Sequence, residues 1–328
     1  MSLGFYVGIL ADERRIEGVR QGLASVVQPG DKVLEVGTGL GTFAFFAAQA
    51  GADHVWAVDR DPVIHVAEML SRVNGFHDRI TFLRGEMSEI ELPGQVDLVV
   101  FEDFAIRLLD DRTWRLMRDA QKEHLRPGGR VFPEHVRLNL SLAGGSEVEA
   151  LLALGDDEPL TAFGLDWSCL GPYLANSPRR ASLSPEALVG TPHAGPEMSL
   201  ATLPTPEQLG LAAEWTLDAD ETVHALALWF DARLAPDSWY ENAPGCEYSV
   251  WGQTILPVFP PLEVRAGESV RARVTPERHP DGAPGWLSWS VESGDERRRG
   301  HEFAAEPASL EDLYGDTFVS DKGKGVAP

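Results

Sequence analysis

The chain has 328 residues, which suits two domains or one large domain. Its 51 acidic and 28 basic residues give a net charge of −23. An acidic surface repels nucleic-acid phosphates and attracts cationic substrates. The densest basic cluster is only Arg297 to Arg299, so we expect no nucleic-acid partner. A role of the charge in solubility alone is an equally good interpretation.

Cysteine content and hydropathy predict a cytoplasmic protein. The two cysteines, Cys169 and Cys246, cannot form a disulfide framework, and there is no CxxC pair. The N-terminus lacks a basic-then-apolar signal pattern, and no apolar run approaches the roughly 20 residues of a membrane helix. We therefore expect no membrane association. The histidines show no ligand spacing, so no metal site is expected either.

Predicted strands and helices alternate through the first 142 residues. In chain order they are a helix at 9–27, a strand at 33–36, a helix at 43–50, a strand at 54–59, a helix at 62–75, strands at 80–85 and 96–103, a helix at 114–124 and a strand that begins at 130. Alternating elements with short connections predict a parallel α/β sheet with helices on both faces. We expect a ligand at the carboxyl ends of its strands.

The pattern changes after residue 142, where helical periodicity becomes sparse and proline and glycine become frequent. Short alternating runs lie at 222–234, 248–259, 268–277 and 285–293. Strands of this length, separated by turns, predict an antiparallel sheet or barrel.

The sequence EVGTGLG, from Glu35 to Gly41, follows a predicted strand and precedes a predicted helix. Glycines in such a loop let the backbone approach a ligand beside a helix N-terminus. A dinucleotide-binding loop reads GxGxxG, whereas here the third glycine comes one residue earlier. An acid also stands two residues before the first glycine, where it suits an ammonium group better than a pyrophosphate.

Asp59 ends the next predicted strand, 18 residues after Gly41, where an acid can accept both hydroxyls of a ribose. A ligand with an ammonium group, a ribose and no phosphate is S-adenosylmethionine. The loop and its two acids therefore predict this cofactor. The alternative interpretation is a tight turn that only packs a helix on a strand.

Several segments resemble the protein arginine methyltransferases, a family of class I S-adenosylmethionine-dependent enzymes, in the form of a divergent bacterial-type member. The similar segments are VLEVGTGLGTFAFFAAQAGADHVWAVD (33–59), ITFLRGEMSEIELPGQVDLVVFED (80–103), LRPGGRVFPEHVRL (125–138), FGLDWSCL (163–170), VHALALWFD (223–231) and SVWGQT (249–254). The resemblance implies a Rossmann-like cofactor domain at 1–142, a β-barrel substrate domain at 143–300 and a C-terminal tail at 301–328. It also implies a helical arm around 161–190 that closes a homodimer.

The resemblance implies that eight residues bind S-adenosylmethionine. Arg15 would hold the methionine carboxylate, Asp59 the ribose, and Met87 would lie against adenine. Asp12 would line the active site from the helix that carries Arg15. The full set is Asp12, Arg15, Glu35, Gly37, Gly39, Gly41, Asp59 and Met87.

The acceptor site implied by the resemblance follows the fourth predicted strand. Glu102 and Asp111, nine residues apart, would be the two acids that grip a guanidinium, although the family has glutamate at both positions. Trp251 would form a wall of this catalytic site. The chemistry explains the acids, because the guanidinium and the methyl-donating sulfonium are both cations. Two unit charges near 4 Å repel by about 4 kcal/mol at an effective dielectric of 20, which carboxylates offset. A solvated acidic loop is the alternative interpretation.

Two departures from the family concern the acceptor. Val250 stands where the family has a histidine that pairs with the N-terminal aspartate, and DFAI at 103–106 replaces the usual WMGY. These changes suggest a different or smaller arginine-like substrate, such as free arginine or a peptide. The predicted reaction is methyl transfer to a guanidino nitrogen of arginine in a protein or peptide, or of free arginine or a related small molecule. The alternatives are a small-molecule N- or O-methyltransferase with a non-guanidino acceptor, and a catalytically silent binding protein.

Overall fold

The computed structural model describes residues 2–102, 111–153, 161–162, 164–166, 177–203, 209–246, 249–277 and 286–302; at 111–113, 161–162, 166 and 286 it describes only the backbone. The chain divides into two compact units. Unit 1 comprises Met1–Arg137, Pro196–Thr205 and Phe230–Trp251, and unit 2 comprises Leu138–Gly195, Pro206–Trp229 and Gly252–Pro328. The domain boundary that we placed after residue 142 stays a prediction.

Unit 1 begins with two helices, α1 (Leu3–Ile9) and α2 (Glu13–Val26), where the sequence predicted one helix at 9–27. The single-helix prediction is wrong at its start, because α1 ends at Ile9 and Asp12 caps the start of α2. The Asp12 Oδ1 atom accepts a hydrogen bond from the Arg15 backbone N–H at 3.0 Å, which satisfies one of the free donors at the helix start. The periodicity of apolar residues did not indicate this helix boundary.

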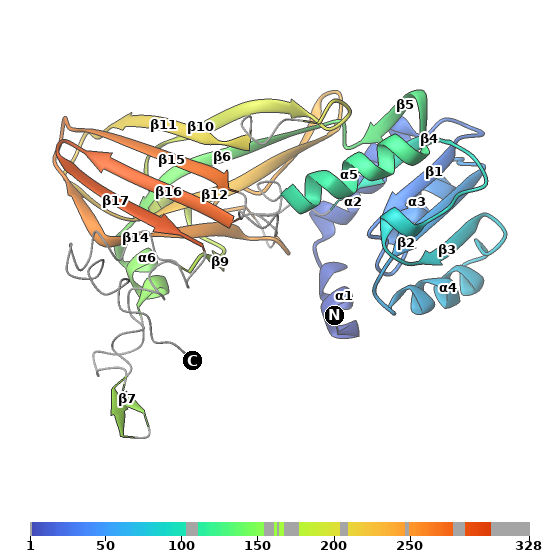
Figure 1. Cartoon of the computed structure of the whole chain (residues 1–328), viewed down its shortest axis with the longest axis horizontal. Coiled ribbons are helices and arrows are strands. Elements are labelled where there is room, and N and C mark those ends of the chain that lie inside the picture. Colours follow the sequence, from blue (N-terminus) through green and yellow to red (C-terminus); the bar gives the residue numbers. More distant parts are fainter. Residues whose placement is uncertain are drawn as a thin grey trace, which may run out of the picture. The chain divides into compact units, whose positions relative to one another are not determined.

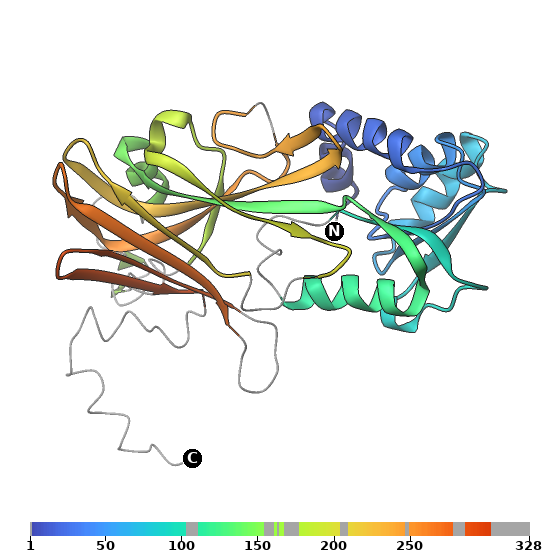
Figure 2. The ribbon, with the colours of Figure 1, turned by 90° about the horizontal axis from the view of Figure 1, so that it is seen from above.

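The core of unit 1 is a five-stranded sheet in the order β3-β2-β1-β4-β5, with parallel pairs throughout (Figure 1). Its elements are β1 Lys32–Val36, α3 Thr42–Gln49, β2 His54–Asp59, α4 Ile64–Val73, β3 Ile80–Arg84, the 3₁₀ turn η1 Met87–Glu89, β4 Val96–Phe101, α5 Asp111–His124 and β5 Leu125–Phe132. Helices α2 and α3 lie on one face of the sheet and α5 on the other (Figure 2). The predicted parallel α/β sheet is confirmed.

The order of these strands gives a topological switch point at β1. The chain runs from β1 to its neighbour β2 and on to β3, and then returns to the other side of β1 as β4. Ligands of open α/β sheets bind at such a switch point, outside the carboxyl ends of the strands. The interior of the sheet is apolar: Val33, Leu34 and Leu98 are fully buried. Burial on both faces explains why the central strands read as continuous apolar runs.

The strand predicted to begin at residue 130 is two strands in the structure. β5 ends at Phe132 and β6 runs over His135–Gly144. Pro133 separates them, and proline has no N–H with which to continue a strand ladder.

The remaining strands form further sheets, in which the antiparallel pairs are β7–β8, β9–β14, β11–β15, β12–β13, β12–β14, β15–β16 and β16–β17. One sheet has the order β10-β6-β12-β14-β9, with β13 paired to β12, and another has the order β11-β15-β16-β17 (Figure 1). The remaining elements are α6 Gly145–Leu152, β7 Thr161–Ala162, β8 Leu165–Asp166, β9 Arg179–Ala181, η4 Pro185–Ala187, β10 Leu188–Ser199, β11 Leu211–Thr216, β12 Glu221–Ala235, β13 Ser238–Glu241, β14 Gln253–Val264, β15 Ser269–Glu277, β16 Trp286–Ser293 and β17 Glu296–His301.

The antiparallel strands that we expected after residue 142 are therefore present. Closure into a barrel is not part of the pairing found among the described residues and stays a prediction. Within the expected arm at 161–190, the described residues include β7, β8, β9, η4 and the start of β10, and residues 163 and 167–176 lie outside the described residues. In the part of the chain that the structure describes, no helix is both long and apolar enough to cross a membrane.

Replacing Gly22 with alanine should destabilise unit 1. A Cβ atom at Gly22 would lie 2.5 Å from the Leu234 carbonyl oxygen and 2.7 Å from the Phe132 ring. Overpacking of this kind costs about 1–3 kcal/mol of unfolding free energy, measurable by denaturant titration. Gly8→Ala is the matched control, because no atom lies within 4 Å of its Cβ position and alanine favours a helix. Equal unfolding midpoints for Gly22→Ala and the wild type would contradict this packing.

Candidate active site

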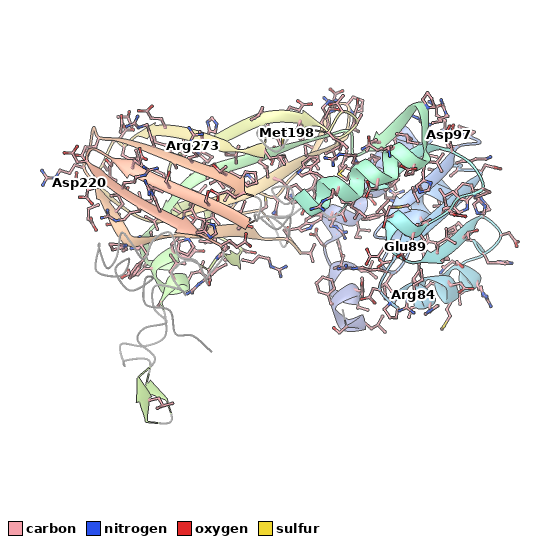
Figure 3. The ribbon with its side chains drawn as sticks, in the orientation of Figure 1. Arg84, Glu89, Asp97, Met198, Asp220 and Arg273 are labelled. Atoms are coloured by element: carbon pink, nitrogen blue, oxygen red, sulfur yellow. The ribbon has the colours of Figure 1, made fainter. Side chains whose placement is uncertain are left out.

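Three acidic residues lie at the carboxyl ends of neighbouring parallel strands. Glu35 is the fourth residue of β1, Asp59 is the last residue of β2, and Glu102 directly follows β4. The opposite end of the sheet is structural: Asp97 accepts a hydrogen bond from the Lys32 backbone N–H. Figure 3 shows Asp97 and Arg84, the last residue of β3, toward opposite ends of the sheet. The acids of interest therefore gather where a ligand is expected.

The glycine loop after β1 is folded against the end of β2. The backbone N–H groups of Gly37 and Thr38 donate to the Val58 carbonyl, and the Gly39 N–H donates to Asp59 Oδ2 at 2.8 Å. Gly39 has a φ of 54°, and a Cβ atom there would meet the ring of Tyr6 at 3.1 Å. Helix α1 thus packs on the loop, and the left-handed backbone with its close contact explains why glycine is needed.

Glu35 is buried and is held largely in its protonated form at neutral pH. Its carboxylate accepts a hydrogen bond from the Thr38 hydroxyl at 2.5 Å. Burial raises the pKa of Glu35 to about 8, against the opposing effect of hydrogen bonds, and the charges of Asp59 and Glu102 raise it further. The three acids are therefore close enough to interact, and the site favours the arrival of a cation.

Arg15 and Glu102 form a buried ion pair. The Arg15 Nε and Nη2 atoms donate to the two carboxylate oxygens of Glu102 at 2.6 and 2.5 Å. The guanidinium carbon also lies 5.0 Å from the centre of the Phe43 ring and 4.8 Å from that of Trp251. The site thus holds a guanidinium by a bidentate carboxylate and two aromatic faces, which is a strong mode of recognition.

The Arg15 guanidinium stays charged in this setting and keeps one donor free. Burial by itself would lower the pKa of Arg15, but the charge and hydrogen bonds of Glu102, together with Asp12, raise it overall. The Nη1 atom is buried and has no hydrogen-bond partner among the described residues. A buried donor without an acceptor is costly, so this atom points to a ligand oxygen.

Asp12 joins the start of α2 to the segment 249–251. Its Oδ2 atom accepts hydrogen bonds from the Val250 backbone N–H at 2.9 Å and from the Tyr240 hydroxyl at 3.4 Å. The Tyr240 hydroxyl also lies 3.2 Å from Ser249 Oγ. Although Val250 lacks the histidine side chain expected from the family, its backbone and a tyrosine bind this aspartate instead.

Trp251 is held by aromatic neighbours. Its ring packs edge-on against Phe230 at 5.0 Å and Tyr240 at 5.4 Å, measured between ring centres. Of the other expected residues, Met87 is buried in η1 after β3. Asp111 begins α5, and its side chain and that of Asp103 lie outside the described residues.

Several residues of the site were not predicted from the sequence. Thr38 follows Glu35 by three residues, and a hydroxyl at that spacing was the available signal. Tyr6, Phe43 and Tyr240 were not predicted, because their role depends on contacts between distant segments. Among the residues that the structure describes, no group of three or more histidine, cysteine or acidic side chains could hold a metal ion.

Comparisons with known proteins find similarity over both parts of the chain. Residues 33–129 match the family described as methyltransferase domain, and residues 158–284 match the arginine methyltransferase oligomerization subdomain. Protein arginine N-methyltransferase 1 of Schizosaccharomyces pombe is 29% identical over 250 residues, 74% of this chain and 72% of that protein. Its namesake in Dictyostelium discoideum is 25% identical over 279 residues, 81% of this chain and 80% of that protein.

Solved structures share the fold. The Trypanosoma brucei PRMT1 enzyme–prozyme heterotetrameric complex with AdoHcy gives a TM-score of 0.79 at 23% identity, over 92% of this chain and 98% of that chain. Arabidopsis thaliana protein arginine methyltransferase 10 gives 0.75 at 20% identity with the same coverage. The two matched domains and the relatives in sequence confirm the resemblance of this chain to the protein arginine methyltransferases.

Proposed function

We propose that the protein transfers a methyl group from S-adenosylmethionine to a guanidino nitrogen of arginine. The observation that carries the proposal is the Arg15–Glu102 pair, in which this site already accommodates a guanidinium between a carboxylate fork and the Trp251 ring. The charges of Asp59 and Glu102, together with that of Glu35 once it ionises, would supply the negative potential that two cationic ligands need.

The residues present fit the cofactor. The free Nη1 donor of Arg15 would take the methionine carboxylate, and Glu35 would ionise to bind the ammonium group. Asp59 would accept the ribose hydroxyls beside the backbone of Gly37, Gly39 and Gly41, and Met87 would contact the adenine. When bound, S-adenosylmethionine supplies a methyl group on a sulfonium cation, whose S–C bond breaks as the acceptor nitrogen bonds the methyl carbon.

The acceptor side of the site would work by charge and position. The carboxylate of Glu102, which binds the Arg15 guanidinium, would also bind the guanidinium of the acceptor, and Asp111 would hold its far edge. Hydrogen bonds to the remote nitrogens fix the plane of the guanidinium and concentrate electron density on the attacking nitrogen. The proton leaves that nitrogen as the new N–C bond forms, so no strong base is required beforehand.

The protein should bind S-adenosylhomocysteine, and the affinity should rise with pH between about 6 and 8. Below its pKa of about 8, Glu35 is protonated, whereas the form that pairs with the ligand's ammonium is ionised. Binding therefore releases a proton, and affinity gains up to about tenfold per pH unit until Glu35 is ionised without ligand. Calorimetry at several pH values, in two buffers of different ionisation enthalpy, measures both quantities.

Two variants distinguish the test of the cofactor site from the test of the role of Glu35. Glu35→Gln should weaken binding and abolish its pH dependence, whereas Glu89→Gln, on the exposed side of η1, should change neither. An absence of binding at every pH would contradict the cofactor site itself. Binding that does not depend on pH would contradict the role of Glu35 alone.

Glu102→Gln should retain S-adenosylhomocysteine binding and lose methyl transfer by at least about a hundredfold, because a neutral amide no longer offsets the two cations. Mass spectrometry after incubation with an arginine-rich peptide, a histone-like protein and free arginine, side by side, measures the loss and identifies the acceptor class. Glu123→Gln, on an exposed part of α5, is the matched control. Unchanged turnover in Glu102→Gln would exclude this acceptor site.

We also propose a homodimer, on the strength of the match of residues 158–284 to an oligomerization subdomain. Light scattering at micromolar concentration should give twice the chain mass of 35.8 kDa. A monomer under these conditions would reject the dimer and leave the methyltransferase proposal intact.

A further inference from the structure

Tyr240 connects two parts of the candidate active site through one hydroxyl group. The ring is buried, and its hydroxyl lies 3.4 Å from Asp12 Oδ2 and 3.2 Å from Ser249 Oγ. Ser249 Oγ in turn accepts the Trp251 backbone N–H at 3.2 Å. The hydroxyl therefore stands between the helix start that carries Arg15 and the segment that carries Trp251.

We propose that Tyr240 is a positioning residue: its hydroxyl fixes residues 249–251 against the start of α2 and so sets the Trp251 ring that faces the acceptor guanidinium. The inference rests on the proposed function for its effect on the acceptor. The proposal that Tyr240 holds residues 249–251 in place does not depend on the proposed function.

The Tyr240 hydroxyl keeps its proton over the neutral pH range. Burial, partly opposed by the Ser249 hydrogen bond and strengthened by the Asp12 charge, raises the pKa of Tyr240 to about 12. The charged groups that face Tyr240 from α2 are Asp12, Arg14 and Arg15. Arg14 covers the ring at 5.0 Å and donates to the Glu241 carbonyl. From its other sides the ring meets the uncharged side chains of Phe230, Ser249 and Trp251.

Two hydrogen-bond donors join the segment 249–251 to Asp12, one directly and one through Ser249. Asp12 is buried, and its second oxygen receives only the Val250 N–H and the Tyr240 hydroxyl in the described contacts. The Val250 backbone N–H fixes the distance between the segment 249–251 and the start of α2. The Tyr240 hydroxyl adds a second anchor through Ser249. Two anchors restrict the rotation of the segment about the first, which is what the orientation of an aromatic ring requires.

Tyr240→Phe removes only the hydroxyl, and its ring can keep the contacts with Phe230, Trp251 and Arg14. Hydrogen exchange of the Val250 and Trp251 amides should become about tenfold faster, the factor expected from the loss of one net hydrogen bond. Thr222→Val, which removes an exposed hydroxyl bonded to Glu263, is the control and should leave these amides unchanged. Unchanged exchange in Tyr240→Phe would overturn the proposal, whether or not the protein methylates arginine.

Kinetics separate positioning from a loss of folded protein. In Tyr240→Phe the KM for the acceptor identified with the wild type should rise about tenfold, with kcat and S-adenosylhomocysteine affinity within about twofold of wild type. A purely structural role predicts the reverse, a lower kcat from fewer active molecules and an unchanged KM, and this result would overturn the proposal.

A double-mutant cycle tests the path of the effect. Because Tyr240 acts through Ser249, Ser249→Ala added to Tyr240→Phe should cost less than its effect in the wild type, both in amide exchange and in KM. Additive effects would mean that the two hydroxyls act separately, which contradicts the proposed connection. If the wild type methylates no arginine acceptor, the proposed function fails, and amide exchange alone then decides the role of Tyr240.

Discussion

The gathering of three acidic side chains at the carboxyl ends of β1, β2 and β4 is the constraint on which the candidate active site depends. An unpaired ionised carboxylate in a protein interior costs several kcal/mol. The protein meets this cost in two ways. Glu102 takes the guanidinium of Arg15 in a bidentate pair, while Glu35 is kept largely protonated by burial at neutral pH. Both arrangements leave the site prepared for cations, because each carboxylate gains by the arrival of positive charge.

The ion pair also determines how distant segments meet. Arg15 reaches Glu102 from the first turn of α2, and the orientation of that turn depends on Asp12, its N-terminal cap. The second carboxylate oxygen of Asp12 binds the segment that ends in Trp251. Removing one partner of a buried ion pair typically costs about 3–5 kcal/mol, because the other charge is left uncompensated. The helix start, the strand end and the aromatic segment therefore form one connected unit rather than three independent contacts.

Sequence patterns within short segments predicted much of the fold. The apolar runs and glycine breaks indicated the five parallel strands and their helices, since strands buried on both faces have a distinctive composition. Two boundaries were wrong: the helix break before Glu13 and the strand break at Pro133. At both places a single residue sets the boundary against the surrounding apolar pattern: Asp12 caps the start of α2, and Pro133 has no N–H to continue the strand ladder. The spacing of Glu35 and Asp59 around the glycine loop indicated the cofactor, because that spacing is set within one strand–loop–helix–strand unit.

The sequence by itself indicated the chemistry of the proposed donor site: a loop with three glycines, an acid before it and an acid at the end of the next strand. These relations are local, so the backbone conformation of one unit is enough to define them. Only the tertiary structure decided that Arg15 pairs with Glu102 across 87 positions of sequence, and that Tyr240 binds Asp12 across 228. No local periodicity encodes such pairs. They arise because folding brings separate segments into a volume from which water is excluded, where each buried polar group must find a partner.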